Sequence, residues 1–210
     1  AIGHLALEDQ NNSGEVSENC AVGGYSGRNL TTGNWNTFIG NYSAGLGVVT
    51  GNDNTCLGYG SGTDLTSGAS NILIGKNAGA NLTDNNNNIA IGHNALVAAN
   101  TGEHYNVAIG HGAMATETTG ADYCVAVGYD ALNSQNANVK NTAIGGLAGD
   151  AITDGTNNTL LGYLAGSAIV SGANNTFIGG EAGYQATGGA NTVVGSAACG
   201  GAMSGLNNTV

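Results

Sequence analysis

The chain has 210 residues, of which 38 are Gly and none is Pro, and only 8% are charged. Three Lys or Arg residues face 14 Asp or Glu residues, so the net charge is -11. This balance disfavours binding to nucleic acid or to an anionic membrane surface, because both attract basic patches. The apolar runs are too short to span a bilayer, so we expect no membrane insertion in this segment.

The four Cys residues show no metal or redox spacing. Cys20, Cys56, Cys124 and Cys199 form no CxxC pair, and no His lies near them in a zinc pattern. We expect them to be small buried apolar residues, and we expect no cofactor.

A Gly preceded by an aliphatic residue recurs about every 17 residues along the whole chain. In chain order it falls at Gly3, Gly23, Gly40, Gly58, Gly75, Gly92, Gly110, Gly128, Gly145, Gly162, Gly179 and Gly195. The first interval is the longest and carries several Glu and Asp residues between 8 and 18, which predicts a projecting acidic loop. The pattern then continues without a break. We therefore expect a single repeat array over residues 1–210, which is a segment of a longer protein because Ala1 falls inside a repeat.

Each repeat predicts a short strand ending at this Gly, as in Asn36–Gly40 or Asn71–Gly75. The fixed Gly predicts a tight corner or a close backbone approach. Four residues before it stands Asn in ten of eleven copies, with Cys124 as the exception, which predicts a ladder of stacked amides. Seventeen residues are too few for the usual helical repeats. We expect an all-β fold, a parallel β-roll or β-solenoid of about twelve coils, with two short strands and two turns in each coil.

Both faces of the expected strands are apolar. Because side chains alternate along a strand, Thr37 and Ile39 share one face and Phe38 occupies the other. We assign the Thr37 and Ile39 face to the interior of the coil. An apolar outer column would then need cover from a partner chain, with these candidates for a homotrimer interface: Phe38, Leu73, Leu160, Phe177 and Val193.

Segments such as Asn175–Gly183 and Asn88–Ala95 resemble the head repeats of trimeric autotransporter adhesins. Similar Asn-Thr-x-Ile-Gly repeats occur in phage tail fibres. The resemblance covers essentially the whole chain, and it implies a homotrimer of left-handed parallel β-rolls. The adhesin heads have a shorter period than this chain, which favours the fibre-like relatives.

The corner after the fixed Gly carries the residues with binding chemistry. His93 and His111 occupy the same column in consecutive copies and are candidates for holding a metal, although an exposed corner accepts them equally well. Exposed aromatic residues that stack on sugars are the candidates for ligand contact: Trp35, Tyr59, Tyr129 and Tyr163. Tyr packed along neighbouring coils with its hydroxyl in water is the alternative. No catalytic arrangement stands out, so we expect no enzyme.

Three functions are compatible with these patterns. The first is a rigid segment of an extracellular trimeric fibre, either a phage tail fibre or a surface adhesin, located at a cell surface or on a virion. Its partners would be copies of itself and a glycan or protein receptor. The second is a subunit of a self-assembling extracellular filament or sheath. The third is an ice-binding solenoid, which the partial Thr ladder favours but an interior placement of that column opposes.

Overall fold

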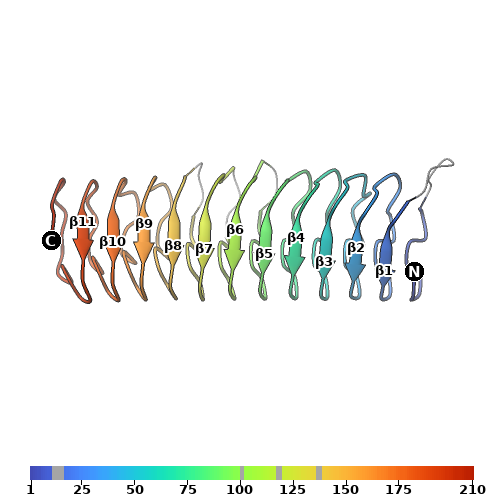
Figure 1. Ribbon diagram of the computed structural model, residues 1–210, viewed down its shortest axis with the longest axis horizontal. Coiled ribbons are helices and arrows are strands. Elements are labelled where there is room, and N and C mark those ends of the chain that lie inside the picture. Colours follow the sequence, from blue (N-terminus) through green and yellow to red (C-terminus); the bar gives the residue numbers. More distant parts are fainter. Residues whose placement is uncertain (11–16, 100–101, 117–119, 136–138) are drawn as a thin grey trace.

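The computed structural model describes residues 1–10, 17–99, 102–116, 120–135 and 139–210, and within them the chain forms a rod of stacked coils (Figure 1). The strands of this part are β1 (Cys20–Val22), β2 (Thr37–Ile39), β3 (Thr55–Leu57), β4 (Ile72–Ile74), β5 (Ile89–Ile91), β6 (Val107–Ile109), β7 (Val125–Val127), β8 (Thr142–Ile144), β9 (Thr159–Leu161), β10 (Thr176–Ile178) and β11 (Thr192–Val194). They form one sheet in sequence order, and every pair is parallel. The all-β parallel solenoid is confirmed. The expected acidic loop falls partly on residues 11–16, which lie outside the described ranges.

The register of the sheet places equivalent residues of successive repeats side by side. Between β2 and β3, Phe38 pairs with Cys56 and Ile39 pairs with Leu57. The expectation of two strands in each coil is wrong, because the described part holds a single three-residue strand in each repeat. The returning segment consists of turns that bond to the next coil through backbone groups, with isolated bridges such as Leu30 to Val49.

The fixed Gly closes each strand, as the sequence predicts. In this column φ lies between 130° and 144°, a conformation that side chains disfavour. A Cβ atom on Gly40 would lie 2.3 Å from the carbonyl oxygen of Gly58 in the next coil. Any side chain here would push two coils apart.

The two faces of the strands are oriented opposite to our prediction. Phe38, Leu73, Leu160, Phe177 and Val193 are buried in the interior of their own coils, with an exposure of 0 to 1%. They do not face a neighbouring chain. The flanking residues point outward instead, and Ile39 is 36% exposed. The reason is the direction in which the coil closes, since the returning segment packs against the middle residue of each strand.

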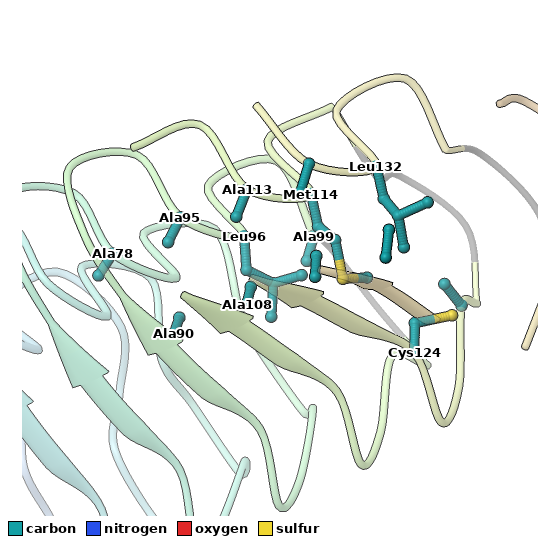
Figure 2. Packing of buried hydrophobic residues seen from close by; sticks show 14 of the residues in the cluster. Ala78, Ala90, Ala95, Leu96, Ala99, Ala108, Ala113, Met114, Cys124 and Leu132 are labelled. Atoms are coloured by element: carbon teal, nitrogen blue, oxygen red, sulfur yellow. The ribbon is translucent and has the colours of Figure 1, made fainter. Parts of the chain in front are cut away.

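In the interior of several coils, the middle residue of the strand and the turn residue that faces it are complementary in size. In several coils whose strand offers a large residue, the turn segment facing it has Gly, and a Cβ on Gly183 would lie 2.5 Å from the ring of Phe177. In the coils of Ala90, Ala108 and Ala126 the equivalent turn position carries Leu96, Met114 and Leu132 instead, whereas the coils of Ala21 and Ala143 have Gly there. Figure 2 shows Leu96 and Met114 pointing from the turns toward the strand side, where Ala108 lies. In these coils the large side chain comes from one wall or from the other, and either arrangement fills the interior.

The expected Asn ladder runs through the buried side of the rod. The Oδ1 atom of Asn36 accepts from the backbone N–H of Asn54 at 2.9 Å and from its side-chain amide at 3.1 Å. The amide of Asn54 also donates to the carbonyl of Gly68 at 2.9 Å. The ladder therefore satisfies polar groups that would otherwise be buried without partners.

Cys124 interrupts the Asn ladder, and a buried Gln repairs the gap. The backbone N–H of Cys124 still donates to Oδ1 of Asn106 at 2.9 Å. The Oε1 atom of Gln135 then accepts from the amide of Asn141 at 3.1 Å, where another coil would use the preceding Asn. The Gln135 amide donates to the Cys124 sulfur at 3.2 Å.

Candidate functional site

The outward face of the sheet is a regular surface that the repeat creates. It consists of the first and third residues of β1 to β11, and we call it the outer face. Its aliphatic members include Leu57, Ile144 and Leu161, which are 40 to 45% exposed. Ten spacings of about 4.8 Å between eleven strands make this face about 48 Å long.

The outer face carries no charged residue, although the whole chain has 17 charged side chains. Its third-residue column is aliphatic throughout, from Val22 to Val194. Its first-residue column holds mainly Thr in the outer coils and Ile or Val from β4 to β7, and begins with Cys20. Scattered exposed aliphatic residues are ordinary, whereas a continuous apolar strip of this length is typical of interaction surfaces.

Cys20 departs from the expectation that all four Cys residues are buried. Cys56 and Cys124 lie inside the coils, whereas Cys20 is exposed and Cys199 is half-buried. Burial raises the pKa of the Cys56 thiol far above its ordinary value, so that thiol is unreactive. Cys20 is thus the accessible thiol on the outer face.

The predicted ligand residues lie on two exposed corners of the coils. Tyr59, Tyr129 and Tyr163 follow the fixed Gly and are 54 to 56% exposed. Trp35 lies in the turn before β2, and its indole N–H donates to the carboxylate of Glu18 at 3.2 Å. The structure brings none of these four together in one site, and their contact with a ligand stays a prediction.

His93 and His111 are neighbours, as their shared column predicts. Their ring centroids are 5.0 Å apart, and the His111 ring stacks on Tyr129. The Oδ1 atom of Asp130 lies 3.9 Å from Nδ1 of His111. Across the part of the chain that the structure describes, no three His, Cys, Asp or Glu side chains converge to hold a metal ion.

Glu103 and Tyr129 are two titratable groups in perturbed environments. Burial raises the pKa of Glu103, although the backbone N–H of Gly120, 3.0 Å from its carboxylate, and the amide of Asn85 partly offset this effect. A hydrogen bond with Asp130 raises the pKa of the exposed Tyr129 hydroxyl. Glu103 stands in the column that holds Gly in most other coils, and the negative charge of Asp84 adds to the rise in its pKa.

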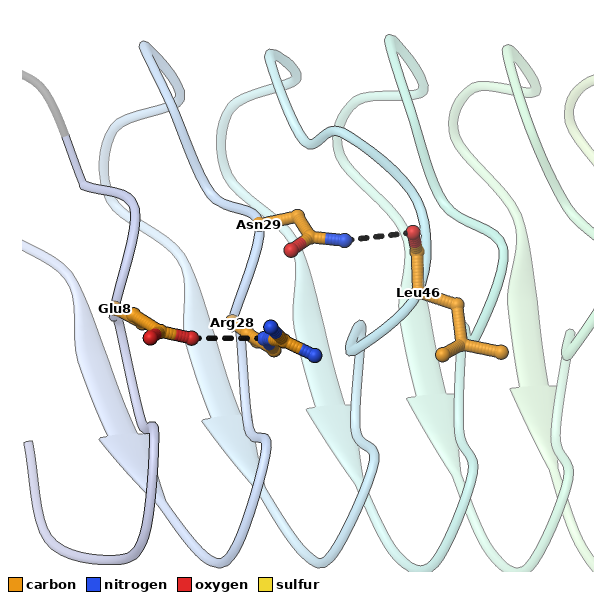
Figure 3. A network of polar contacts seen from close by, with 4 residues as sticks. All are labelled: Glu8, Arg28, Asn29 and Leu46. Atoms are coloured by element: carbon orange, nitrogen blue, oxygen red, sulfur yellow. Dashed lines mark hydrogen bonds and ion pairs between the residues drawn. The ribbon is translucent and has the colours of Figure 1, made fainter.

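Sequence reasoning missed a group of side chains near the N-terminal end. Tyr25 and Tyr42 stack face to face, with centroids 4.8 Å apart and planes 2° from parallel. Arg28 lies over the Tyr25 ring at 5.6 Å and pairs with Glu8 at 2.8 Å (Figure 3). The sequence does contain a signal for this stacking, because Tyr25 and Tyr42 both stand two positions after the fixed Gly of consecutive repeats.

No family model matches the chain, and comparisons with curated proteins and with solved structures also find no match. Within the described residues there is no helix that could cross a membrane. Function must therefore be argued from the surfaces themselves.

Proposed function

We propose that this chain is a rigid segment of an extracellular trimeric fibre that displays loops or a tip for attachment to a surface. In this proposal each chain is a left-handed roll of about twelve coils, and three chains pack their outer faces around a common axis. Bridges from Ile2 to Val22 and from Thr192 to Thr209 support one further coil at each end of the sheet.

The main support for this proposal is the long, uncharged, aliphatic outer face on an otherwise strongly acidic chain. A net charge of -11 keeps copies apart wherever the acidic groups meet. The outer face is the surface where copies can meet without burying a charge. Burial of its Ile, Leu and Val side chains would then drive association, and the parallel backbone bonds would make the rod stiff.

The test is the mass of the protein in solution. Sedimentation equilibrium at micromolar concentration should show a trimer, and Leu161→Lys should give a monomer because it places a charge in the interface. Val170→Lys is the matched control, since Val170 is 51% exposed but lies outside the strands. A folded wild-type monomer would rule the proposal out. Growing filaments would support the alternative of a self-assembling filament or sheath.

An ice-binding role is a second candidate, favoured by the orientation of the Thr column. Thr142, Thr159, Thr176 and Thr192 stand in successive strands and are exposed or half-buried on the outer face. The interior placement that opposed this function is therefore wrong. A stable trimer would cover the same face, so thermal hysteresis should be measured on the monomeric fraction of the wild-type chain. Absence of hysteresis in that fraction would exclude this role.

A further inference from the structure

The corner column that contains Tyr25 and Tyr42 has a gap in the following coil. Tyr25 covers one face of the Tyr42 ring. The opposite face of Tyr42 points toward the next coil, where the same column holds Gly60. Gly60 has no side chain, so this face of Tyr42 is left uncovered by its column.

The gap forms a hollow with a volume of about 450 Å³. It is lined by Tyr42, Leu46, Tyr59, Gly60, Thr63 and Asn77. We call it the Tyr42 hollow. The Tyr59 ring stands at 75° to the Tyr42 ring, with centroids 6.4 Å apart, so the two rings form a corner. From Tyr42 to Asn77 the column spans two coil spacings, about 9.6 Å, which leaves room for one flat ring between them.

Polar groups stand beside these rings. The Thr63 hydroxyl donates to the carbonyl of Gly60 at 2.6 Å and keeps its oxygen available as an acceptor. One N–H of the Asn77 amide points to Asn94 at 3.3 Å, which leaves a second N–H and the carbonyl oxygen for a ligand.

The walls of the hollow are held by bonds between coils. The backbone N–H of Leu46 donates to the carbonyl of Thr63 at 3.0 Å. The Asn29 amide donates to the carbonyl of Leu46 at 2.9 Å (Figure 3). The Leu46 side chain is 56% exposed beside the two Tyr rings. The hollow is therefore formed before any ligand arrives, which lowers the cost of binding.

We propose that the Tyr42 hollow binds a neutral pyranose, with the apolar C–H face of the sugar stacked on Tyr42. The hydroxyl groups at the sugar edge then bond to the Asn77 amide and the Thr63 oxygen, so that aromatic stacking and hydrogen bonds act together. The acidic surface of the chain disfavours sialic acids, uronates and sulfated sugars. This inference deepens the proposed adhesive role, but sugar binding does not require the trimer.

The test is the binding of methyl glycosides of glucose, galactose, mannose and N-acetylglucosamine to the full chain, followed by saturation-transfer NMR and titration. At least one should bind wild type with a dissociation constant of about 1 mM. Gly60→Asn should weaken that binding at least about tenfold, or about 1.4 kcal/mol, because the new side chain fills the hollow. The backbone conformation suits this change, since Asn77 and Asn94 occupy the same column with φ of 55° and 56° and Gly60 has φ of 63°. The new Cβ would lie 2.8 Å from Oδ1 of Asn77, so the flexible Asn77 side chain must turn away from the hollow.

Leu164→Asn is the matched control, because Leu164 stands in the same column at φ of 56° in a coil that does not line the hollow. It should bind the glycoside as wild type does. Tyr42→Ala should also lose binding, with circular dichroism confirming the fold. The proposal is overturned if no glycoside binds at about 20 mM, twentyfold above the expected constant, or if Gly60→Asn binds as tightly as wild type. Neither result changes the solution mass, so failure here is distinct from failure of the fibre proposal.

Discussion

At the scale of single residues, neighbouring Gly residues have very different roles. Gly179 belongs to the fixed column, and a Cβ there would lie 2.5 Å from the backbone of Gly195. A Cβ on Gly180 would meet nothing closer than 4.0 Å. The abundance of Gly thus reflects both strict contacts between coils and open turns.

We expect Gly179→Ala to lower the free energy of unfolding by about 3 kcal/mol or more, because it combines φ of 132° with a backbone clash. Gly180→Ala should change it by less than about 0.5 kcal/mol. Chemical denaturation followed by circular dichroism measures both. Equal effects of the two substitutions would show that the corner geometry does not limit stability.

Glu103 makes stability depend on pH in a direction opposite to that of a salt-bridged acid. Burial raises the pKa of its carboxyl above the usual 4.5, so the folded state holds the proton more tightly than the unfolded state does. As pH rises from about 4.5 through the folded-state value, the unfolded state releases its proton first and stability falls. The contribution of this group is complete only below pH 4.5.

Glu103→Gln should remove this slope, which can reach about 1.4 kcal/mol per pH unit for one proton. The measurement is the free energy of unfolding between about pH 4 and 8 for both proteins. The variant should gain stability relative to wild type as pH rises, because its neutral amide does not ionise. A difference that is independent of pH would mean that Glu103 titrates normally in the folded chain.

At the scale of the repeat element, stability depends on matching the strand to its facing turn. Leu96 stands in the turn of the coil that contains Ala90, next to the coil that contains Ala108. Other coils reverse the arrangement, with Phe177 or Leu160 opposite Gly. In these coils the strand residue and the turn residue that faces it must therefore be matched in size as a pair.

We expect Leu96→Ala to cost about 2–5 kcal/mol through a cavity and Ala108→Leu to cost about 1–3 kcal/mol through overpacking. The double variant should cost less than the sum, because the new Leu fills the space that the old one leaves. Thermal unfolding of the four proteins measures the coupling. Simple additivity would mean that the two positions do not share one space.

At the scale of the whole molecule, the outer face makes a geometric prediction through Cys20. In a parallel trimer, equivalent residues of the three chains lie at the same height along the axis. A short bis-maleimide should therefore join Cys20 of two chains in a Cys199→Ser background and give a covalent dimer on a denaturing gel. Cys20→Ser should abolish the product. A trimer by mass without this product would show that the outer face does not form the interface.

The sequence alone determined the repeat, its register and the positions of the strands, the fixed Gly corner and the Asn ladder. These features follow from sequence because the same backbone bonds must form again about every 17 residues, so identical residues return to identical places. The bonds between Asn36 and Asn54 are the direct result.

Only the tertiary structure decided which face of the strand is the interior. A three-residue strand such as Thr37–Ile39 is nearly apolar throughout and carries no amphipathic signal. The direction in which the coil closes buries Phe38 and exposes Ile39. The Tyr42 hollow likewise depends on three successive coils, since it exists where Tyr42, Gly60 and Asn77 follow one another in one column. Surfaces of this kind arise from contacts between coils and cannot be read from one repeat.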